Sequence, residues 1–294
     1  MSKPAAAVDS TTGRTYALSL PPEWLAQHPP SAAVRMTGTT AMLPSVTSIL
    51  SGSDKPGLPW GAAGETSSWV IQNLDTVQEL VASAAAAPEE GTNPCKACGR
   101  MTIRHLHDKG WWLHEQCQEP WKVIRKQFQL RWNEKRDRGT STHDFVEQSI
   151  LGVAIDPADF GDAEGNARSW LRFVEKYDPR FIMSEATVFN LRYGYAGTLD
   201  SIMEVGGQRW LVDVKSGPKV YFEHHLQLAA YRYAEGVYVS AGVVEPMPDV
   251  DAAGVLLLGE DRYKFEEVTA GPDAFERGFA SLLTLFRYKE AHGE

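Results

Sequence analysis

The sequence is short of cysteine, of long apolar runs and of positive charge. With three cysteines among 294 residues, a disulfide framework is excluded, and the thiols are expected to stay reduced or to bind a metal. No stretch approaches the roughly 18 consecutive apolar residues of a membrane-spanning helix. The N-terminal residues turn polar before a secretory segment could form. We therefore expect a protein with no membrane partner that stays in the cytoplasm.

The overall charge excludes one simple class of nucleic-acid-binding protein. The chain has 38 Asp and Glu against 29 Lys and Arg, a formal net charge of −9. A protein that merely coats DNA with positive charge would have the opposite balance. Hydrophobic residues make up 43% of the chain, with 9 Trp, 10 Tyr and 11 Phe, which is ample for a packed core. One elaborated globular domain or two small ones are expected.

Two pairs of residues have the spacing of zinc ligands. They are Cys95, Cys98, His114 and Cys117. Each pair can supply two ligands from a turn to one shared tetrahedral Zn²⁺, and three thiolates with one imidazole make a closed structural site. The segment between the pairs is too short and polar for a core of its own, so a metal would stabilise it. His105 or His107 could replace His114, and the alternative is three unrelated buried cysteines beside a histidine.

Composition divides the chain into four parts. Residues 1–40 are rich in Pro, Ala, Ser and Thr, which predicts a flexible arm with one short strand at 14–18. Residues 41–91 have helical patterns and form the helical N-terminal part. Residues 92–118 are the zinc-binding insertion, and residues 119–294 form the main domain.

Residues 121–138 are predicted to form a helix with a local excess of positive charge. Its basic residues are Lys122, Arg125, Lys126, Arg131, Lys135, Arg136 and Arg138, against only Glu134 and Asp137. Such a run is by default a solvated helix face, but Lys and Arg that neutralise phosphates supply most non-specific affinity for DNA. Arg125, Lys126 and Arg136 are therefore candidate DNA-binding residues. After Gly139, a second helix is expected from about Ser141.

A β-rich block follows from residue 184 to residue 215. Gly206 and Gly207 predict a two-residue hairpin turn, because both central residues of a type I′ turn need positive φ. In that register Asp200 lies directly opposite Asp213. Period-two alternation divides the other residues between two faces. Thr198, Asp200 and Ile202 are expected to share a face with Leu211, Asp213 and Lys215, and the opposite, core face to hold Leu199, Met203, Trp210, Val212 and Val214.

Two carboxylates opposite each other on paired strands destabilise a sheet unless something neutralises them. A divalent cation is the simplest neutraliser, and hard oxygen ligands suit Mg²⁺ or Mn²⁺. Lys215 lies on the same face, where it can position an attacking water or stabilise developing negative charge. The alternative is a partly exposed ion-pair cluster of Asp200, Asp213 and Lys215, which is common on antiparallel sheets.

Further motifs accompany these carboxylates in a fixed order. They are Gly139–His143, Glu185 on a strand, Gly197–Asp200, Asp213–Gly217, and Gln227 with Tyr231 on a helix. The set resembles the PD-(D/E)xK nuclease superfamily, specifically its RecB-like branch, which includes phage-type exonucleases and CRISPR-associated nucleases. The resemblance covers about residues 138–233. It implies an α/β fold with a restriction-endonuclease-like core, a central mixed β-sheet flanked by helices, within residues 119–294.

The resemblance also implies roles for individual residues. His143, Asp200 and Asp213 would ligate the catalytic Mg²⁺ or Mn²⁺ with the backbone carbonyl of Val214, and Lys215 would be the catalytic lysine. The remaining residues have softer roles. Glu185 is at the family's first acidic position, and Gln227 with Tyr231 would contact DNA or order the site, although Tyr231 could be only a packing residue. Leu199 replaces the Pro of the superfamily's name, and the zinc insertion is not part of the family pattern.

We expect a metal-dependent DNA exonuclease acting in recombination, replication or DNA processing, located in the host cytoplasm if phage-encoded. Its partner would be DNA with free ends and no sequence preference, and a single-strand annealing or recombination protein and an oligomeric state are compatible with this role. The alternatives are a catalytically inactive nucleic-acid-binding protein that uses the zinc module, a structure-specific endonuclease, and a protein–protein adaptor supported by the Trp-rich insertion.

Overall fold

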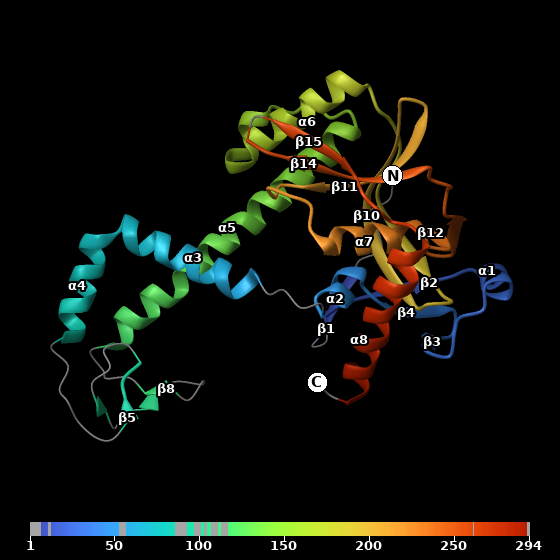
Figure 1. The fold of residues 1–294 in the computed structure, drawn as a ribbon. Helices are drawn as coiled ribbons and strands as arrows, with labels where there is room; N and C mark the ends of the chain where they lie inside the picture. Colours follow the sequence, from blue (N-terminus) through green and yellow to red (C-terminus); the bar gives the residue numbers. More distant parts are fainter. Residues whose placement is uncertain are drawn as a thin grey trace. The chain divides into compact units, whose positions relative to one another are not determined.

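The computed structural model describes residues 7–10, 13–52, 57–85, 93–96, 101–102, 105–106, 111–112, 117–260 and 262–292. The chain forms two compact units. The first comprises residues 1–54 and 138–294, and the second comprises residues 55–137 (Figure 1).

The first unit is built around a mixed seven-stranded sheet. Its strands are β9 (Arg180–Asn190), β10 (Tyr195–Val205), β11 (Gln208–Lys215), β12 (Gly236–Ser240), β13 (Val243–Pro246), β14 (Ala252–Leu258) and β15 (Tyr263–Glu267). They are arranged in the order β13–β12–β9–β10–β11–β14–β15. The neighbours β11 and β14 are parallel, and the other neighbouring pairs are antiparallel. A parallel pair needs a crossover connection, and the connection here includes helix α7 (Phe222–Arg232).

Helices flank this sheet with two separate apolar cores. One core joins Ile202 and Leu211 of the sheet to α2 (Val46–Leu50), α7, the π-helical segment η3 (Ala274–Phe279) and α8 (Ala280–His292). The other joins Met203 and Val212 to the C-terminal part of α5 (Gln118–Ile150) and to α6 (Glu164–Tyr177), which follows the 3₁₀ helix η2 (Pro157–Ala163). The predicted α/β class, a mixed sheet flanked by helices, is therefore confirmed.

A four-stranded antiparallel sheet precedes these elements in the first unit. It has the order β1–β2–β4–β3, from β1 (Ala7–Ser10), β2 (Gly13–Ser19), β3 (Arg35–Thr37) and β4 (Thr40–Pro44), and α1 (Pro22–Gln27) lies between β2 and β3 in the chain. The short strand expected at 14–18 is present within β2. The expectation of a flexible arm does not hold for residues 13–40, because Tyr16 and Leu18 are buried in a core with Phe189 of β9.

The second unit contains α3 (Gly57–Gln72), α4 (Leu74–Ala85), four two-residue strands and the N-terminal part of α5. The strands are β5 (Asn93–Pro94), β6 (Met101–Thr102), β7 (His105–Leu106) and β8 (Trp111–Trp112), paired as β5–β6 and β7–β8. Glu65 on α3 forms ion pairs with Arg131 and Lys135 on α5. Part of the basic run therefore forms ion pairs with an acidic residue of its own unit.

Helix α5 is continuous through Gly139, whereas the sequence predicts two helices there. Gly costs a helix only about 1 kcal/mol relative to Ala, so a single Gly need not end a helix. A side chain at residue 139 would lie in contact with Ser216, because an ideal Cβ there is 3.5 Å from Ser216 Oγ.

Among the described residues, no helix combines the length and the apolar character needed to cross a membrane.

Candidate metal centre

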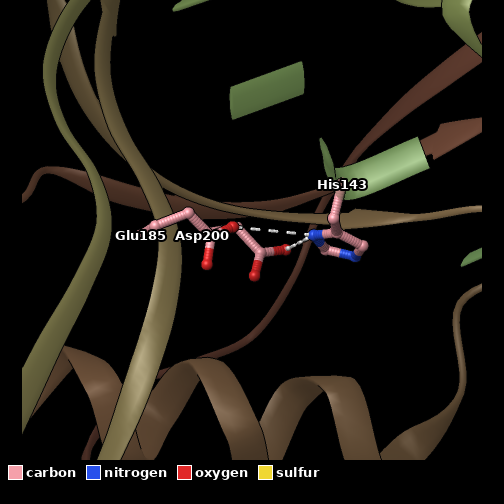
Figure 2. Close-up of side chains that lie close together, drawn as sticks. All are labelled: His143, Glu185 and Asp200. Atoms are coloured by element: carbon pink, nitrogen blue, oxygen red, sulfur yellow. Dashed lines mark ion pairs between the residues drawn. The ribbon is translucent and has the colours of Figure 1, made fainter. Parts of the chain in front are cut away.

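Three side chains from distant parts of the sequence converge in the first unit. His143 comes from α5, Glu185 from β9 and Asp200 from β10, and one potential ligand atom of each lies within 4.8 Å of the others. His143 Nδ1 is 3.8 Å from Glu185 Oε1 and 3.8 Å from Asp200 Oδ2 (Figure 2). One imidazole and two carboxylates at this spacing could hold a divalent metal ion.

The β9–β10 ladder places the two carboxylates opposite each other. It pairs Leu199 with Ala186 and Ser201 with Ser184, and Asp200 and Glu185 lie between these two pairs. Glu185 has a φ of 46°, in the left-handed region that residues other than Gly seldom adopt. Strain of this kind often accompanies a functional site.

The same irregularity corrects the predicted faces of β10. Leu199 was expected on the core face with Met203, but it packs in the cluster of Ile202 and Leu211 instead. Strict alternation along β10 would put Leu199 and Ile202 on opposite faces. The β9–β10 ladder is irregular in this region: Glu185 of β9 has a left-handed backbone, and the register shifts between Ile202 and Met203.

The predicted hairpin register between β10 and β11 is confirmed. Gly206 and Gly207 both have positive φ, 61° and 80°, and the pairing runs from Val205–Gln208 to Ser201–Val212. The next pair in this register would be Asp200 and Asp213. At this level the Asp200 side chain contacts β11: its Oδ2 accepts a hydrogen bond of 2.6 Å from the backbone N–H of Val214. Asp200 is thus held by both neighbouring strands.

Asp213 is buried beside these groups, with 1% of its side chain exposed. Its Oδ1 accepts a 2.6 Å hydrogen bond from Lys215 Nζ. Its Oδ2 is also buried and has no hydrogen-bond partner among the described residues. Burial raises the pKa of Asp213, the Lys215 ammonium opposes that rise, and the Asp200 carboxylate adds to it. One buried carboxylate oxygen, Oδ2 of Asp213, is therefore left without a hydrogen bond from the described residues.

The two cationic groups of the site are held in their charged forms. Burial alone would lower the pKa of Lys215, but the carboxylates of Asp213 and Asp200 outweigh burial and raise it. The Asp200 carboxylate, against the effect of burial and with help from Glu185, raises the pKa of His143 to about 9. Two positive groups therefore lie beside the three acidic side chains of the site.

These residues fit a hard divalent cation. Carboxylate oxygens with one imidazole nitrogen suit Mg²⁺ or Mn²⁺, and the unpartnered Oδ2 of Asp213 marks a place where positive charge is missing. The sequence assigns Glu185 no definite role, but its side chain lies in the cluster with His143 and Asp200. Asp213 is not a member of this cluster, although its charge interacts with those of Lys215 and Asp200. Val214 has its side chain buried in the core that includes Met203 and Val212.

Helix α7 carries Gln227 and Tyr231, four residues apart. Gln227 Nε2 donates a 3.2 Å hydrogen bond to the Tyr231 hydroxyl. Tyr231 is buried, and an ideal Cβ on Gly197 would be only 2.6 Å from its Cε1. Burial raises the pKa of Tyr231 well above its ordinary value. Tyr231 therefore packs against β10, the strand that carries Asp200.

Sequence reasoning missed His224 in the first turn of α7. Its charge interacts with those of Asp213 and Lys215, and burial lowers its pKa. Its Nδ1 accepts a hydrogen bond of 3.2 Å from the backbone N–H of Tyr221. The signal in the sequence is its position three residues before Gln227, one helical turn away.

The remaining predicted residues lie in the second unit. Arg125, Lys126 and Arg136 are on the N-terminal part of α5, where Arg136 forms an exposed ion pair with Asp137. Of the zinc candidates, Cys95 and Cys117 are buried. Cys98 and His114 lie outside the described residues, as does the alternative ligand His107.

Comparisons with known proteins add no family. No protein-family model matches the chain, and no curated protein matches it. Among similar solved structures is one described as "Crystal structure of SSO0001", with 17% sequence identity and a TM-score of 0.27. The alignment covers 49% of this chain and 66% of the other, so this chain spans just under two thirds of that protein.

Proposed function

We propose that the protein is a metal-dependent deoxyribonuclease that hydrolyses phosphodiester bonds, with a restriction-endonuclease-like core and the active-site pattern of the RecB-like PD-(D/E)xK branch. The observation that carries this proposal is the convergence of His143, Glu185 and Asp200 beside the buried Asp213 and its partner Lys215. An ion-pair cluster with only a structural role would not need an unpartnered buried carboxylate oxygen, which costs stability.

The residues divide the work of the reaction. His143, Glu185, Asp200 and Asp213 would hold Mg²⁺ or Mn²⁺, which when bound polarises a phosphate oxygen and lowers the pKa of a bound water. The raised pKa of Lys215 keeps its ammonium protonated at neutral pH. Lys215 would act as a hydrogen-bond donor to the attacking water or to the developing phosphate charge. In-line attack on phosphorus breaks the bond to the 3′ oxygen, which leaves with a proton from solvent.

The fold supports this assignment by keeping the reacting groups rigid. Asp200 is fixed by the backbone of β11 and by its place between paired residues of β9 and β10. Tyr231 packs on Gly197, three residues before Asp200, and so restricts the same strand. Preorganised ligands and donors are what phosphoryl transfer requires, because its catalysis consists almost entirely of positioning and charge stabilisation.

The zinc module and the DNA path are part of the proposal. A Zn²⁺ bound by Cys95, Cys98, His114 and Cys117 would stabilise the short strands β5–β8, which have little core of their own. Arg125, Lys126 and Arg136 would contact phosphates of DNA without reading its sequence. We favour an exonuclease with free DNA ends as substrate, and a recombination or annealing protein as its functional partner.

An assay on two DNA forms tests the function. Purified full-length protein with Mg²⁺ or Mn²⁺ should degrade end-labelled linear DNA and leave covalently closed circular DNA intact. Asp213→Asn should lower the rate by at least about a thousandfold, because it removes a charged ligand at the reacting centre. Asp273→Asn is the matched control, since Asp273 is 77% exposed in an ion pair with Arg277. Absence of cleavage with either metal would leave a DNA-binding protein, and cleavage of circles would indicate an endonuclease.

A further inference from the structure

Two aromatic side chains are exposed at the start of the helix that borders the candidate metal centre. Tyr221 caps α7 and is 43% exposed, and Phe222, its first residue, is 68% exposed. Single exposed hydrophobic residues are ordinary on protein surfaces. Two adjacent rings beside a cluster of titratable groups are less ordinary, because burying each ring would contribute stability that the fold forgoes.

The position of these rings relative to the site follows from their neighbours in the chain. Lys215, which binds Asp213, ends β11 six residues before Tyr221. Two residues beyond Phe222, His224 interacts electrostatically with Asp213 and Lys215. The aromatic pair therefore follows, in the chain, the strand whose last residue, Lys215, contacts Asp213.

Local contacts hold Tyr221 in place and set an ammonium group beside its ring. The backbone N–H of Tyr221 donates to His224 Nδ1, and the backbone N–H of His224 donates to the Tyr221 carbonyl at 3.0 Å. The Tyr221 ring meets the His224 ring edge-on, with ring centres 5.6 Å apart. Lys219 Nζ lies 5.1 Å from the centre of the Tyr221 ring. A fixed aromatic surface with an adjacent ammonium combines the two features that bind single-stranded nucleic acid, base stacking and backbone attraction.

We propose that Tyr221 and Phe222 form a stacking platform for unpaired bases of the DNA strand whose phosphate enters the metal centre. Lys219 binds a phosphate of the same strand. The protein therefore prefers single-stranded or frayed ends over fully paired DNA. This inference rests on the proposed nuclease function for the identity of its ligand, and it adds the strand state of the substrate and the residues that select it.

Phe222 is the better residue to test, because its exposed ring contributes little to the core. Binding is measured in an Asp213→Asn background, which prevents cleavage, with single-stranded oligonucleotides that carry 2-aminopurine at successive positions. Stacking quenches the fluorescence of this base, so one or two positions near the bound phosphate should be quenched. Phe222→Ala should abolish that quenching and weaken single-strand binding by roughly 5- to 100-fold, the range found for loss of one base–aromatic stack. Blunt duplex binding should change less than about twofold.

An abasic nucleotide supplies the second arm of a double-mutant cycle. Placed at the most strongly quenched position, it should weaken binding of the Asp213→Asn protein by a similar factor and have no further effect when Phe222→Ala is added. Phe222→Trp should retain affinity, since Trp presents a larger aromatic face. Tyr288→Ala is the control, because Tyr288 is an equally exposed ring, 60% accessible, on α8.

The outcomes separate this inference from the proposed function. The platform is overturned if Phe222→Ala behaves like Tyr288→Ala on every substrate, or if it weakens single-strand and duplex binding equally. The nuclease function is rejected by absence of cleavage in the otherwise wild-type protein with Mg²⁺ and Mn²⁺. Quenching that depends on Phe222 in a protein that never cleaves would keep the platform and reject the nuclease.

Discussion

Lys215 and Asp213 form a 2.6 Å hydrogen-bonded ion pair in which the carboxylate is buried and only one of its two oxygens is used. Both residues come from β11, two positions apart on the same face of the strand. The lysine therefore does two things in the metal-free protein. It offsets part of the charge of Asp213 and Asp200, and it stays protonated for use in the reaction.

Replacing this lysine should separate stability from activity. Lys215→Met removes the hydrogen-bond donor to a buried carboxylate, and we expect the metal-free protein to lose about 1–3 kcal/mol of unfolding free energy, measured by urea denaturation. Mg²⁺ or Mn²⁺ should restore part of the stability but no activity. Lys264→Met is the control, because Lys264 forms an exposed 2.8 Å pair with Glu266 and should cost under about 0.5 kcal/mol. Equal effects of the two variants would contradict this view of Lys215.

The left-handed backbone at Glu185 allows its charge and its conformation to be tested separately. Asn adopts positive φ more readily than Glu, so Glu185→Asn should change metal-free stability by less than about 1 kcal/mol. It should weaken Mn²⁺ binding by at least about tenfold, because loss of a residue that only supports a metal ligand already costs about that much affinity. Isothermal titration calorimetry gives the affinity. Asp178→Asn is a matched control, since Asp178 has φ of 43° at the C-cap of α6 and should leave metal binding unchanged.

Local signals in the sequence were enough to predict the central hairpin. Gly206 and Gly207 set the turn, and the turn set a register that the structure confirms as far as Ser201 and Val212. The same logic failed at Leu199, because period-two alternation assumes an unbroken extended chain. The break is associated with Glu185 on the neighbouring strand, a conformation that no local pattern in the sequence specifies.

Non-local packing explains the other differences. Residues 13–40 have the composition of a loose arm, yet Tyr16 and Leu18 alternate with the exposed Ala17 and are buried against β9. That period of two was visible in the sequence, but its partner surface was not. The candidate site was predictable in its members, since His143, Asp200, Asp213 and Lys215 stand in recognisable motifs. The grouping of Glu185 with His143 and Asp200 could not be read from spacing, because it depends on how three separate elements meet.

Gly197 should not tolerate a side chain. An ideal Cβ there would lie 2.6 Å from Tyr231 Cε1 and 3.2 Å from Val46 Cγ2, so Gly197→Ala must displace a buried ring. We expect a loss of about 1–3 kcal/mol in unfolding free energy, typical of overpacking, and lower nuclease activity because Asp200 is three residues away. Gly271→Ala is the control, since nothing lies within 4 Å of its Cβ position. Equal stability of the two variants would show that Tyr231 does not pack on β10 in this way.

Metal binding should depend on pH through His143. Its pKa of about 9, raised mainly by Asp200, means that the imidazole is protonated at neutral pH in the metal-free protein. Below pH 9 a metal must displace this proton, so Mn²⁺ affinity should rise by up to about tenfold per pH unit towards pH 9 and then level off. Calorimetry between pH 6.5 and about 9.5 measures this slope. His143→Gln should bind more weakly with a flatter profile, and a pH-independent wild type would exclude His143 as a ligand.

The same raised pKa has a consequence for the metal-free protein. Because the folded-state pKa of His143 exceeds its ordinary value of 6.5, its contribution to stability is complete below about pH 6.5. The contribution is lost as pH rises from 6.5 through about 9. The melting temperature without metal should therefore decline over that window more in the wild type than in His143→Gln, while the rise produced by added Mn²⁺ should grow.

The zinc module should be separable from the catalytic centre. Cys95 and Cys117 are both buried, in a part of the chain whose described strands have two residues each. A metal would give these strands the stability that so small a core cannot supply. Elemental analysis of freshly purified protein should find about one equivalent of zinc, because three thiolates and one imidazole form a closed site for a single ion.

Variants then assign that zinc. Asp213→Ala should keep the metal and lose nuclease activity, whereas Cys117→Ser should lose the metal and unfold the second unit at a lower temperature. His114→Ala compared with His105→Ala and His107→Ala identifies the fourth ligand, since only the true ligand should release zinc. Zinc that disappears with Asp213→Ala would place it in the catalytic centre instead. Absence of zinc from the wild type would remove the module and leave the roles of His143, Asp200, Asp213 and Lys215 to be judged on cleavage alone.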